Sequence, residues 1–204
     1  GHIDVPAYVT HNDTTYEVTT LGTGYSGFRD CRDLTSVYIP KEIKMINNNP
    51  FRECPNLTNI SVDPENKYYD SRGLCHALVT SADNPYEEPN MLVAACKNTT
   101  IPNDVEVIGV EAFYQCHYNL KHVIIPNSVT TIKRSAFNGC NQLSTLVIGE
   151  GVSTIEEYAF ADCSALQTVM CLATTPPFLR NFAFANTPVD ALDEVHEIAL
   201  QLPV

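Results

Sequence analysis

"LSTLVIGEGVSTIEEYAFADC" (residues 143–163) repeats the pattern of "LKHVIIPNSVTTIKRSAFNGC" (residues 120–140) at a distance of 23 residues. Each stretch has apolar residues at its first, fourth and sixth positions. Further along, each has Val, then Ile three residues later, Phe after five more and Cys after another three. Self-similarity at a fixed period is the sequence signature of a repeat architecture.

Further copies of both halves of this unit occur along the chain. The first half recurs as "LTSVYIP" (34–40), "LTNISVD" (57–63) and "LQTVMCL" (166–172), and the second half as "EIKMINNNPFREC" (42–54) and "DVEVIGVEAFYQC" (104–116). A unit of this length with a Leu-x-x-Val-x-Ile strand is typical of leucine-rich solenoids. The predicted fold is therefore a right-handed, β-rich leucine-rich repeat solenoid. Each repeat of about 23 residues would supply one short parallel strand, with positions one, four and six facing the core.

The whole chain is predicted to form one such domain. The runs "LCHALV" (74–79) and "MLVAAC" (91–96) flank a loop rich in Pro, Asn and Glu, which predicts a hairpin protruding from the solenoid. The spacing of apolar residues in "DALDEVHEIALQL" (190–202) is helical and predicts a cap over the last rung. The predicted parts are an N-terminal cap and degenerate repeat (1–31), regular repeats (32–62), the hairpin-expanded repeat (63–100), regular repeats (101–173) and a C-terminal cap (174–204).

The repeated pattern resembles the BspA-like subclass of leucine-rich repeats, from about Val5 to about Ala185. The first unit (5–31) departs from that subclass at Gly27, where Ala is usual, and in two extra residues before Phe28. The resemblance implies a bacterial protein, secreted or on the cell surface, that binds proteins of a host or a neighbouring cell. Gly1 has no Met before it and indicates that any leader has been removed, so the first residues do not test export.

Five of the eight cysteines occupy the same place in their repeats: Cys31, Cys54, Cys116, Cys140 and Cys163. Stacked repeats would space their side chains by about 4.8 Å in a column. A straight column cannot converge on one zinc ion, and its uniform rungs do not favour a disulfide. Buried free thiols are the favoured interpretation there, and for Cys171. For Cys75 and Cys96 in the predicted hairpin, a disulfide and two free thiols both stay open.

Composition narrows the classes of function. The net charge of −12 argues against nucleic acid as a partner, because such binding depends on cationic contacts with phosphates. No run of apolar residues approaches the length of a membrane span, so membrane insertion is not expected. We find no catalytic, dinucleotide or zinc motif, and we expect neither cofactor nor metal site. The chain is expected not to be an enzyme.

The outward side of the strands carries the first candidate partner-binding residues. The fifth strand position reads Tyr38, Ser61, Ile124, Val147 and Met170, so that three adjacent rungs expose an apolar row, and Lys121 and His122 lie beside it. Such a row rimmed by polar residues can mark a partner site, although β-branched side chains also simply suit strands. The expected hairpin tip supplies a second candidate: Tyr86, Glu87 and Glu88.

These features predict a non-enzymatic, extracellular module for protein binding or adhesion, whose ligand and oligomeric state the sequence does not identify. The first alternative is a passive structural spacer of a bacterial surface protein. The second is an enzyme on an unrecognised motif.

Overall fold

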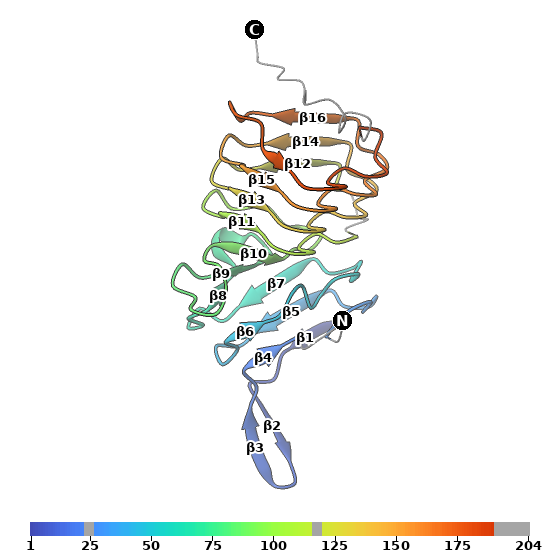
Figure 1. Cartoon of the computed structure of the whole chain (residues 1–204). Coiled ribbons are helices and arrows are strands. Elements are labelled where there is room, and N and C mark those ends of the chain that lie inside the picture. The colour runs from blue at the N-terminus through green and yellow to red at the C-terminus, as the bar shows by residue number, and fades with distance from the viewer. Residues whose placement is uncertain (23–26, 116–119, 190–204) are drawn as a thin grey trace.

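The computed structural model describes residues 1–22, 27–115 and 120–189. These residues form an elongated β-solenoid in which successive turns of the chain stack along one axis (Figure 1). The short 3-10 helix η1 (Arg72–Leu74) is the helical element among them. The prediction of a leucine-rich repeat solenoid is confirmed.

The strands of the Leu-x-x-Val-x-Ile half form two parallel three-stranded sheets. The first has the order β1 (His2–Asp4), β5 (Ser36–Ile39) and β7 (Asn59–Val62). The second has the order β12 (His122–Ile125), β14 (Thr145–Ile148) and β16 (Thr168–Cys171). The register pairs residues that occupy the same position in neighbouring repeats, such as Val123 and Leu146, which are both at position four. The sequence period therefore becomes a spatial stack of identical strand positions.

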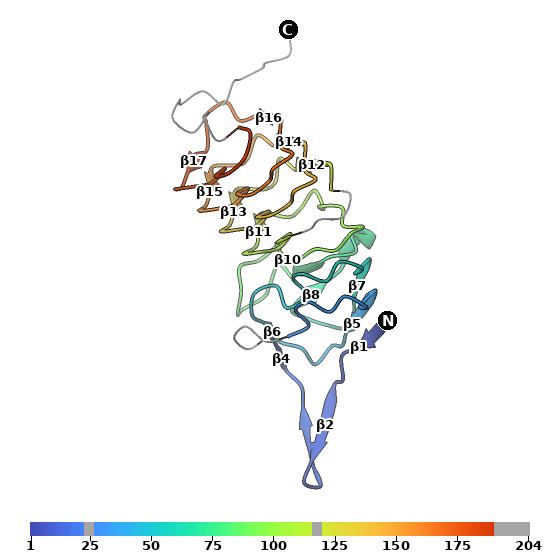
Figure 2. The same cartoon turned by 90° about the vertical axis from the view of Figure 1, so that its right-hand side faces the viewer.

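The other wall of the solenoid is a seven-stranded sheet built from shorter strands (Figure 2). In spatial order it consists of β17 (Phe178–Leu179), β15 (Thr154–Ile155), β13 (Thr131–Ile132), β11 (Val107–Ile108), β10 (Met91–Ala94), β9 (Leu78–Thr80) and β8 (Tyr69–Asp70). A separate parallel pair joins β4 (Thr20–Leu21) and β6 (Met45–Ile46) near the N-terminus.

A stack of phenylalanine rings runs through the core between the two walls. The ring centroids of Phe113 and Phe137 lie 4.5 Å apart, those of Phe137 and Phe160 5.0 Å apart, and those of Phe160 and Phe184 5.1 Å apart. All four rings are buried. The Ala-Phe pair of each repeat thus supplies one rung of a continuous aromatic column, and the small Ala lets neighbouring turns approach closely.

The buried residues divide into two clusters that meet beside the expanded repeat. Phe51 belongs to the N-terminal cluster and Phe113 to the C-terminal one. The buried Asn49 bridges them, because its Nδ2 donates to the Glu111 carbonyl at 3.0 Å and its Oδ1 accepts from the Phe51 amide at 2.9 Å. A largely buried ion pair between Arg52 and Glu111 lies at the same junction.

Each C-terminal loop turns through two residues with positive φ, four positions apart, on either side of its Ala-Phe pair. The pairs are Glu111 and Gln115, Ser135 and Gly139, Tyr158 and Asp162, and Phe182 and Asn186. Gly139 alone of these eight avoids the steric cost that a Cβ adds in this region. The loop conformation is therefore imposed by stacking rather than by residue type.

The expanded repeat does form the predicted hairpin, but the hairpin does not protrude. Strands β9 and β10 pair antiparallel within the seven-stranded wall, and Leu78, Val79 and Leu92 are fully buried. The loop beyond them folds back, with the Asn84 side chain accepting from the Tyr86 amide and donating to the Tyr68 carbonyl. The prediction of a projecting hairpin is wrong because these strands are apolar on both faces and complete the wall.

The segment that projects is an N-terminal arm, β2 (Tyr8–His11) and β3 (Thr14–Glu17), which extends away from the solenoid (Figure 1). Its two-residue turn has positive φ at Asn12 and Asp13, as a type I′ hairpin requires. Every residue of both strands is exposed. The expected degenerate first repeat thus carries an inserted arm, while its later part continues the solenoid through β4 and the stacking of Phe28 on Phe51.

Removing the arm is expected to leave the solenoid intact. The Val18 amide donates to the Ala7 carbonyl at 2.8 Å, so the two ends of the arm lie together and a short Gly-Gly link could join them. Because every residue of Tyr8–Glu17 is exposed and the ion pair of Glu17 with Lys44 lies at the surface, we expect the deletion to change the free energy of unfolding by less than about 1 kcal/mol. Urea denaturation measures it, and a larger loss would mean that the arm supports the fold.

The described cysteines are free thiols, including Cys75 and Cys96. The column thiols donate to the backbone of the preceding repeat, since Cys140 Sγ lies 3.1 Å from the Phe113 carbonyl oxygen and Cys163 Sγ 3.2 Å from that of Phe137. Cys96 Sγ donates to the His76 carbonyl in the same manner. The described members are therefore free thiols as predicted, and Cys140, Cys163 and Cys171 are also buried as predicted, whereas Cys31 and Cys54 are half-buried.

Some predictions lie outside the described residues. They are the place of Cys116 in the column and the C-terminal helix over 190–202. The division of the chain into caps and repeats also stays a prediction.

Candidate interaction surface

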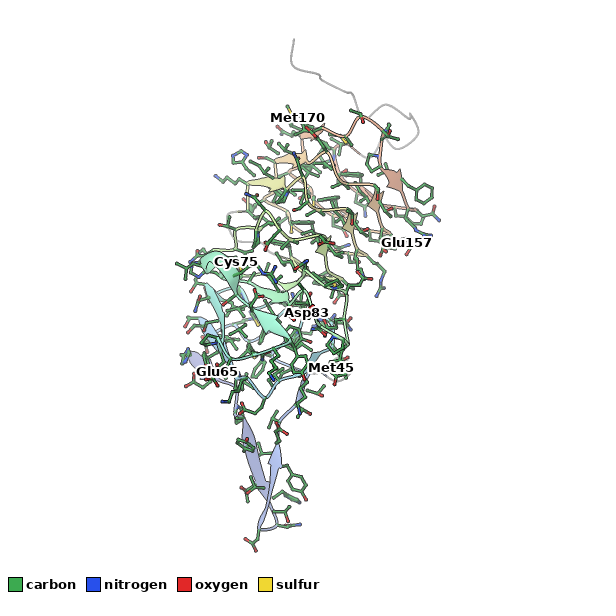
Figure 3. All side chains as sticks on the ribbon, turned by 90° about the vertical axis from the view of Figure 1, so that its left-hand side faces the viewer. Met45, Glu65, Cys75, Asp83, Glu157 and Met170 are labelled. Carbon is green, nitrogen blue, oxygen red and sulfur yellow. The ribbon has the colours of Figure 1, made fainter. Side chains whose placement is uncertain are left out.

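The apolar row lies on the outer face of sheet β12–β14–β16. The register places Ile124 beside Val147 and Val147 beside Met170. Ile124 is 70% exposed, and the other two side chains are half-buried. Figure 3 shows Met170 at the C-terminal end of the solenoid. The strand pleat produces this face, because the alternate residues Val123 and Ile125 point into the core.

Polar side chains line one side of this row. His122 pairs in register with Thr145, and Thr145 with Thr168. Lys121 precedes β12 and is exposed, and the Ser144 hydroxyl donates to its carbonyl at 3.0 Å. The structure thus brings together Lys121, His122, Ile124, Val147 and Met170. We refer to these five residues as the apolar-row surface.

Tyr38 belongs to a different surface. It lies on β5 in the first sheet, which is not hydrogen-bonded to β12 in the described structure. Its hydroxyl donates to an Asp63 carboxylate oxygen at 2.8 Å. The Glu65 backbone amide and then this hydroxyl lower the pKa of Asp63. Tyr38 is therefore held in an acidic polar network, apart from the apolar row.

The candidates of the expanded repeat are engaged within the solenoid. The Tyr69 hydroxyl donates to the carboxylate of Glu87 and accepts from the Ile46 amide at 2.7 Å. Burial raises the pKa of the Glu87 carboxyl. Glu88 forms an ion pair with Lys133, 2.8 Å between Oε1 and Nζ. These carboxylates connect the expanded repeat to its neighbours.

Tyr86 and Glu88 are the exposed members of that group, and Glu87 is half-buried. The Tyr86 ring lies 5.6 Å from the ring of Tyr68, between centroids, and the Tyr86 side chain is 55% exposed. It does not lie at a protruding tip, as the sequence predicted, because the loop folds back onto the wall of the solenoid. Of the three residues, Tyr86 and the ion-paired Glu88 keep a surface that a partner could reach.

Replacing Glu87 by Gln should change how stability depends on pH. The raised pKa means that the fold favours the protonated carboxyl, so this group's stabilisation is complete below its ordinary pKa of 4.5 and is lost as pH rises through the folded value. Gln cannot ionise. We therefore expect the stability of Glu87→Gln relative to the unmodified chain to rise between pH 4.5 and 7.

Urea denaturation across that pH range measures the difference. Glu150→Gln, at an exposed carboxylate, is the matched control. A constant difference for Glu87→Gln would contradict the burial argument.

Further exposed apolar side chains lie at the two ends of the solenoid, and the sequence analysis did not single them out. Tyr8, Val9 and Tyr16 are exposed on the arm. Near the other end, Tyr158 and Phe182 stack with centroids 5.4 Å apart, and Phe178 is 64% exposed. For the arm, the signal was the Asn-Asp pair between two alternating runs, which marks a hairpin turn.

Metal-binding clusters and membrane-spanning helices are absent from the parts of the chain that the structure describes. No group of three or more His, Cys, Asp or Glu side chains there could hold a metal ion. No helix in those parts has the length and apolar character needed to span a bilayer.

A hollow of about 350 Å³ opens beside Arg52 and Glu53 at the junction of the two core clusters.

A family model, the BspA type leucine-rich repeat region, matches six copies over residues 12–81 and 93–196. The chain belongs to the BspA-type leucine-rich repeat family. This match covers most of the chain and includes every regular repeat identified from the sequence. Members of this family are built on a leucine-rich repeat scaffold, which is compatible with protein binding. No curated protein matches the chain.

The chain is similar to solved structures of bacterial proteins. The pneumococcal vaccine antigen PcpA has a TM-score of 0.64 at 19% identity, over 76% of this chain and 37% of that chain. The leucine-rich repeat protein TpLRR of T. pallidum has a TM-score of 0.48 at 18% identity, over 95% of this chain and 80% of that one.

A leucine-rich repeat protein from Bacteroides ovatus has a TM-score of 0.46 at 23% identity, over 92% of this chain and 49% of that one. At these identities the likeness to PcpA concerns the fold alone. The BspA-type chain described here spans little more than a third of the PcpA chain.

Proposed function

We propose that this chain is a non-enzymatic protein-binding module of a bacterial cell-surface or secreted protein, and that it binds through the apolar-row surface. The observation that carries the proposal is the alignment of Ile124, Val147 and Met170 on three adjacent rungs. Exposed apolar groups rimmed by polar residues mark interaction sites more often than the rest of a surface does. Membership of the BspA-type family supports the extracellular location.

The rigidity of the surface favours recognition. Beneath the row, Val123, Leu146 and Ile148 are buried, and the strands are fixed by parallel pairing on both sides of β14. A partner docking here would order few protein groups, so less binding free energy would be lost to conformational entropy. A flat, preorganised strand face on a scaffold is suited to a protein surface rather than to a small enclosed ligand.

The test is a triple substitution, Ile124→Lys, Val147→Lys and Met170→Lys. A ligand is first identified by pull-down from cell-surface and extracellular-matrix extracts, and its Kd for the unmodified chain is measured with purified components. The triple variant should weaken binding by at least about 100-fold, because apolar anchors at the centre of an interface carry most of its free energy. The melting temperature should stay within a few degrees, since the three side chains point outward from the sheet and the β-propensity scale spans only about 1 kcal/mol per residue.

A matched control replaces Tyr8, Val9 and Tyr16 on the arm by Lys. It makes the same change in charge at three exposed apolar positions, far from the row. This control should bind normally. If the triple variant at the row also bound normally, the ligand would use another surface. Failure to capture any ligand would favour the passive spacer.

A further inference from the structure

The apolar-row surface differs in charge from the rest of the chain. The sequence carries 24 Asp and Glu residues against 12 Lys and Arg. Yet strands β12, β14 and β16 contain no carboxylate. Among the described residues, Lys121 and His122 are the charged or titratable groups at the start of β12, and the exposed Glu150 follows the far end of β14 by two residues. The equivalent face of the first sheet contains Asp4 on β1 and borders Asp63. The absence of acid is thus local to the candidate surface.

Lys121 also differs from most cations of the chain. Within the described residues, seven of the twelve each form an ion pair with a carboxylate: Arg29, Arg32, Arg52, Arg72, Lys41, Lys44 and Lys133. For Lys121 the described structure gives no ion pair, and its side chain is exposed. An internal structural role therefore does not account for this cation.

Strand geometry places the polar group close to the apolar row. His122 and Ile124 are both exposed on the same strand, with the buried Val123 between them. Residues two apart on a strand lie on one face, about 6.6 Å from each other. Lys121 lies one residue further back. A ligand group that contacts Ile124 can therefore be followed, within one or two residues, by a group that meets His122 and Lys121.

We propose that the partner is a protein segment that places apolar side chains on the row of Ile124, Val147 and Met170 and an adjacent carboxylate against Lys121 and His122. The proposal rests on the proposed function and names the chemistry of its partner. Carboxylate is the complementary group for an exposed ammonium and an imidazole, which are both donors when the ring is protonated.

The acidic residues of the rest of the chain disfavour partners that are acidic throughout. A uniformly acidic partner would be repelled by the net charge of −12 at distances up to the Debye length, about 8 Å at physiological ionic strength. A segment with one or two carboxylates beside apolar residues gains the short-range contact with little of that repulsion. Specificity then comes from a local match of apolar and acidic groups.

The experiment uses a random-peptide library displayed on phage and selected on the full chain. A variant with Ile124, Val147 and Met170 all replaced by Ser, which adds no charge to the face, serves for counterselection, so that the retained peptides depend on the row. Synthetic copies of these peptides are then titrated by fluorescence anisotropy. We expect them to carry Asp or Glu beside apolar residues, and expect replacement of that acid by its amide to raise Kd about fivefold.

Variants of the chain complete the test. Lys121→Glu should raise Kd about fivefold for the acidic peptides, as expected for a rim charge. Lys67→Glu makes the same change in net charge at an exposed site on the expanded repeat and should leave Kd unchanged. Row-dependent peptides without acid, or equal binding to Lys121→Glu, would overturn the acidic partner but not the apolar row. Recovery of no row-dependent peptide would overturn both.

Discussion

Replacing Phe137 by Ala is expected to destabilise the chain by about 3–5 kcal/mol. Its ring is fully buried and lies between those of Phe113 and Phe160, at 4.5 and 5.0 Å. The substitution removes both stacking contacts and leaves a cavity, which the flanking rungs cannot fill because their backbones are fixed by hydrogen bonds. The Phe137 amide, for example, donates to the Ala159 carbonyl at 2.7 Å. Urea denaturation gives the free energy of unfolding.

Phe182→Ala is the matched control for this prediction. Phe182 also stacks on a ring of the previous repeat, Tyr158, at a similar distance, but its side chain is 58% exposed. Its loss should cost less than about 1 kcal/mol, the scale of an aromatic pair without burial. Equal losses for the two variants would show that stacking rather than burial stabilises the column.

Asn49→Ala is expected to cost about 2–3 kcal/mol, because it leaves the buried Phe51 amide without its acceptor. The Glu111 and Ala112 carbonyls each lose one donor but keep another, from the Tyr114 and Ala95 amides respectively. Since Asn49 bridges the two core clusters, the loss should weaken the junction between the N-terminal and C-terminal halves. Hydrogen exchange around Phe51 should accelerate more than exchange around Phe137.

Asn56→Ala provides the comparison. The Asn56 side chain also donates to a backbone carbonyl, that of Arg32 at 2.8 Å, but it does so at the exposed surface, where water can replace the lost bond. The variant should be within about 0.5 kcal/mol of the unmodified chain. An equal cost at both positions would mean that burial of Asn49 is not what makes its hydrogen bonds matter.

The repeats were predictable because apolar residues recur at the same strand positions of each unit. Leu143, Leu146 and Ile148 are all fully buried, as positions one, four and six were expected to be. The pleat then dictated that Val147 faces outward. Because repeats of equal length stack in register, residues at the same strand position become neighbours, and the candidate row could be predicted from the sequence.

The irregular segments were harder to place. In the expanded repeat, "LCHALV" and "MLVAAC" showed two strands but not which face they bury, since apolar residues stand on both faces. The position of Glu87 depends on Tyr69 and Ile46, which are 18 and 41 residues away and outside any repeat correspondence. Long-range polar partners of this kind leave no periodic signal. The arm was overlooked because residues 5–31 were matched to a repeat as a whole.

The thiol contacts bear on how chains of this kind could change in length. Cys140 and Cys163 each donate to a backbone carbonyl of the repeat before them, so neither of these two thiols needs a second cysteine. A disulfide framework would gain or lose repeats only in pairs, or leave a reactive thiol behind. Here a single unit could be duplicated or deleted in one genetic step, and every remaining thiol of this kind would still find its acceptor. The length of such a solenoid can therefore change by one repeat at a time.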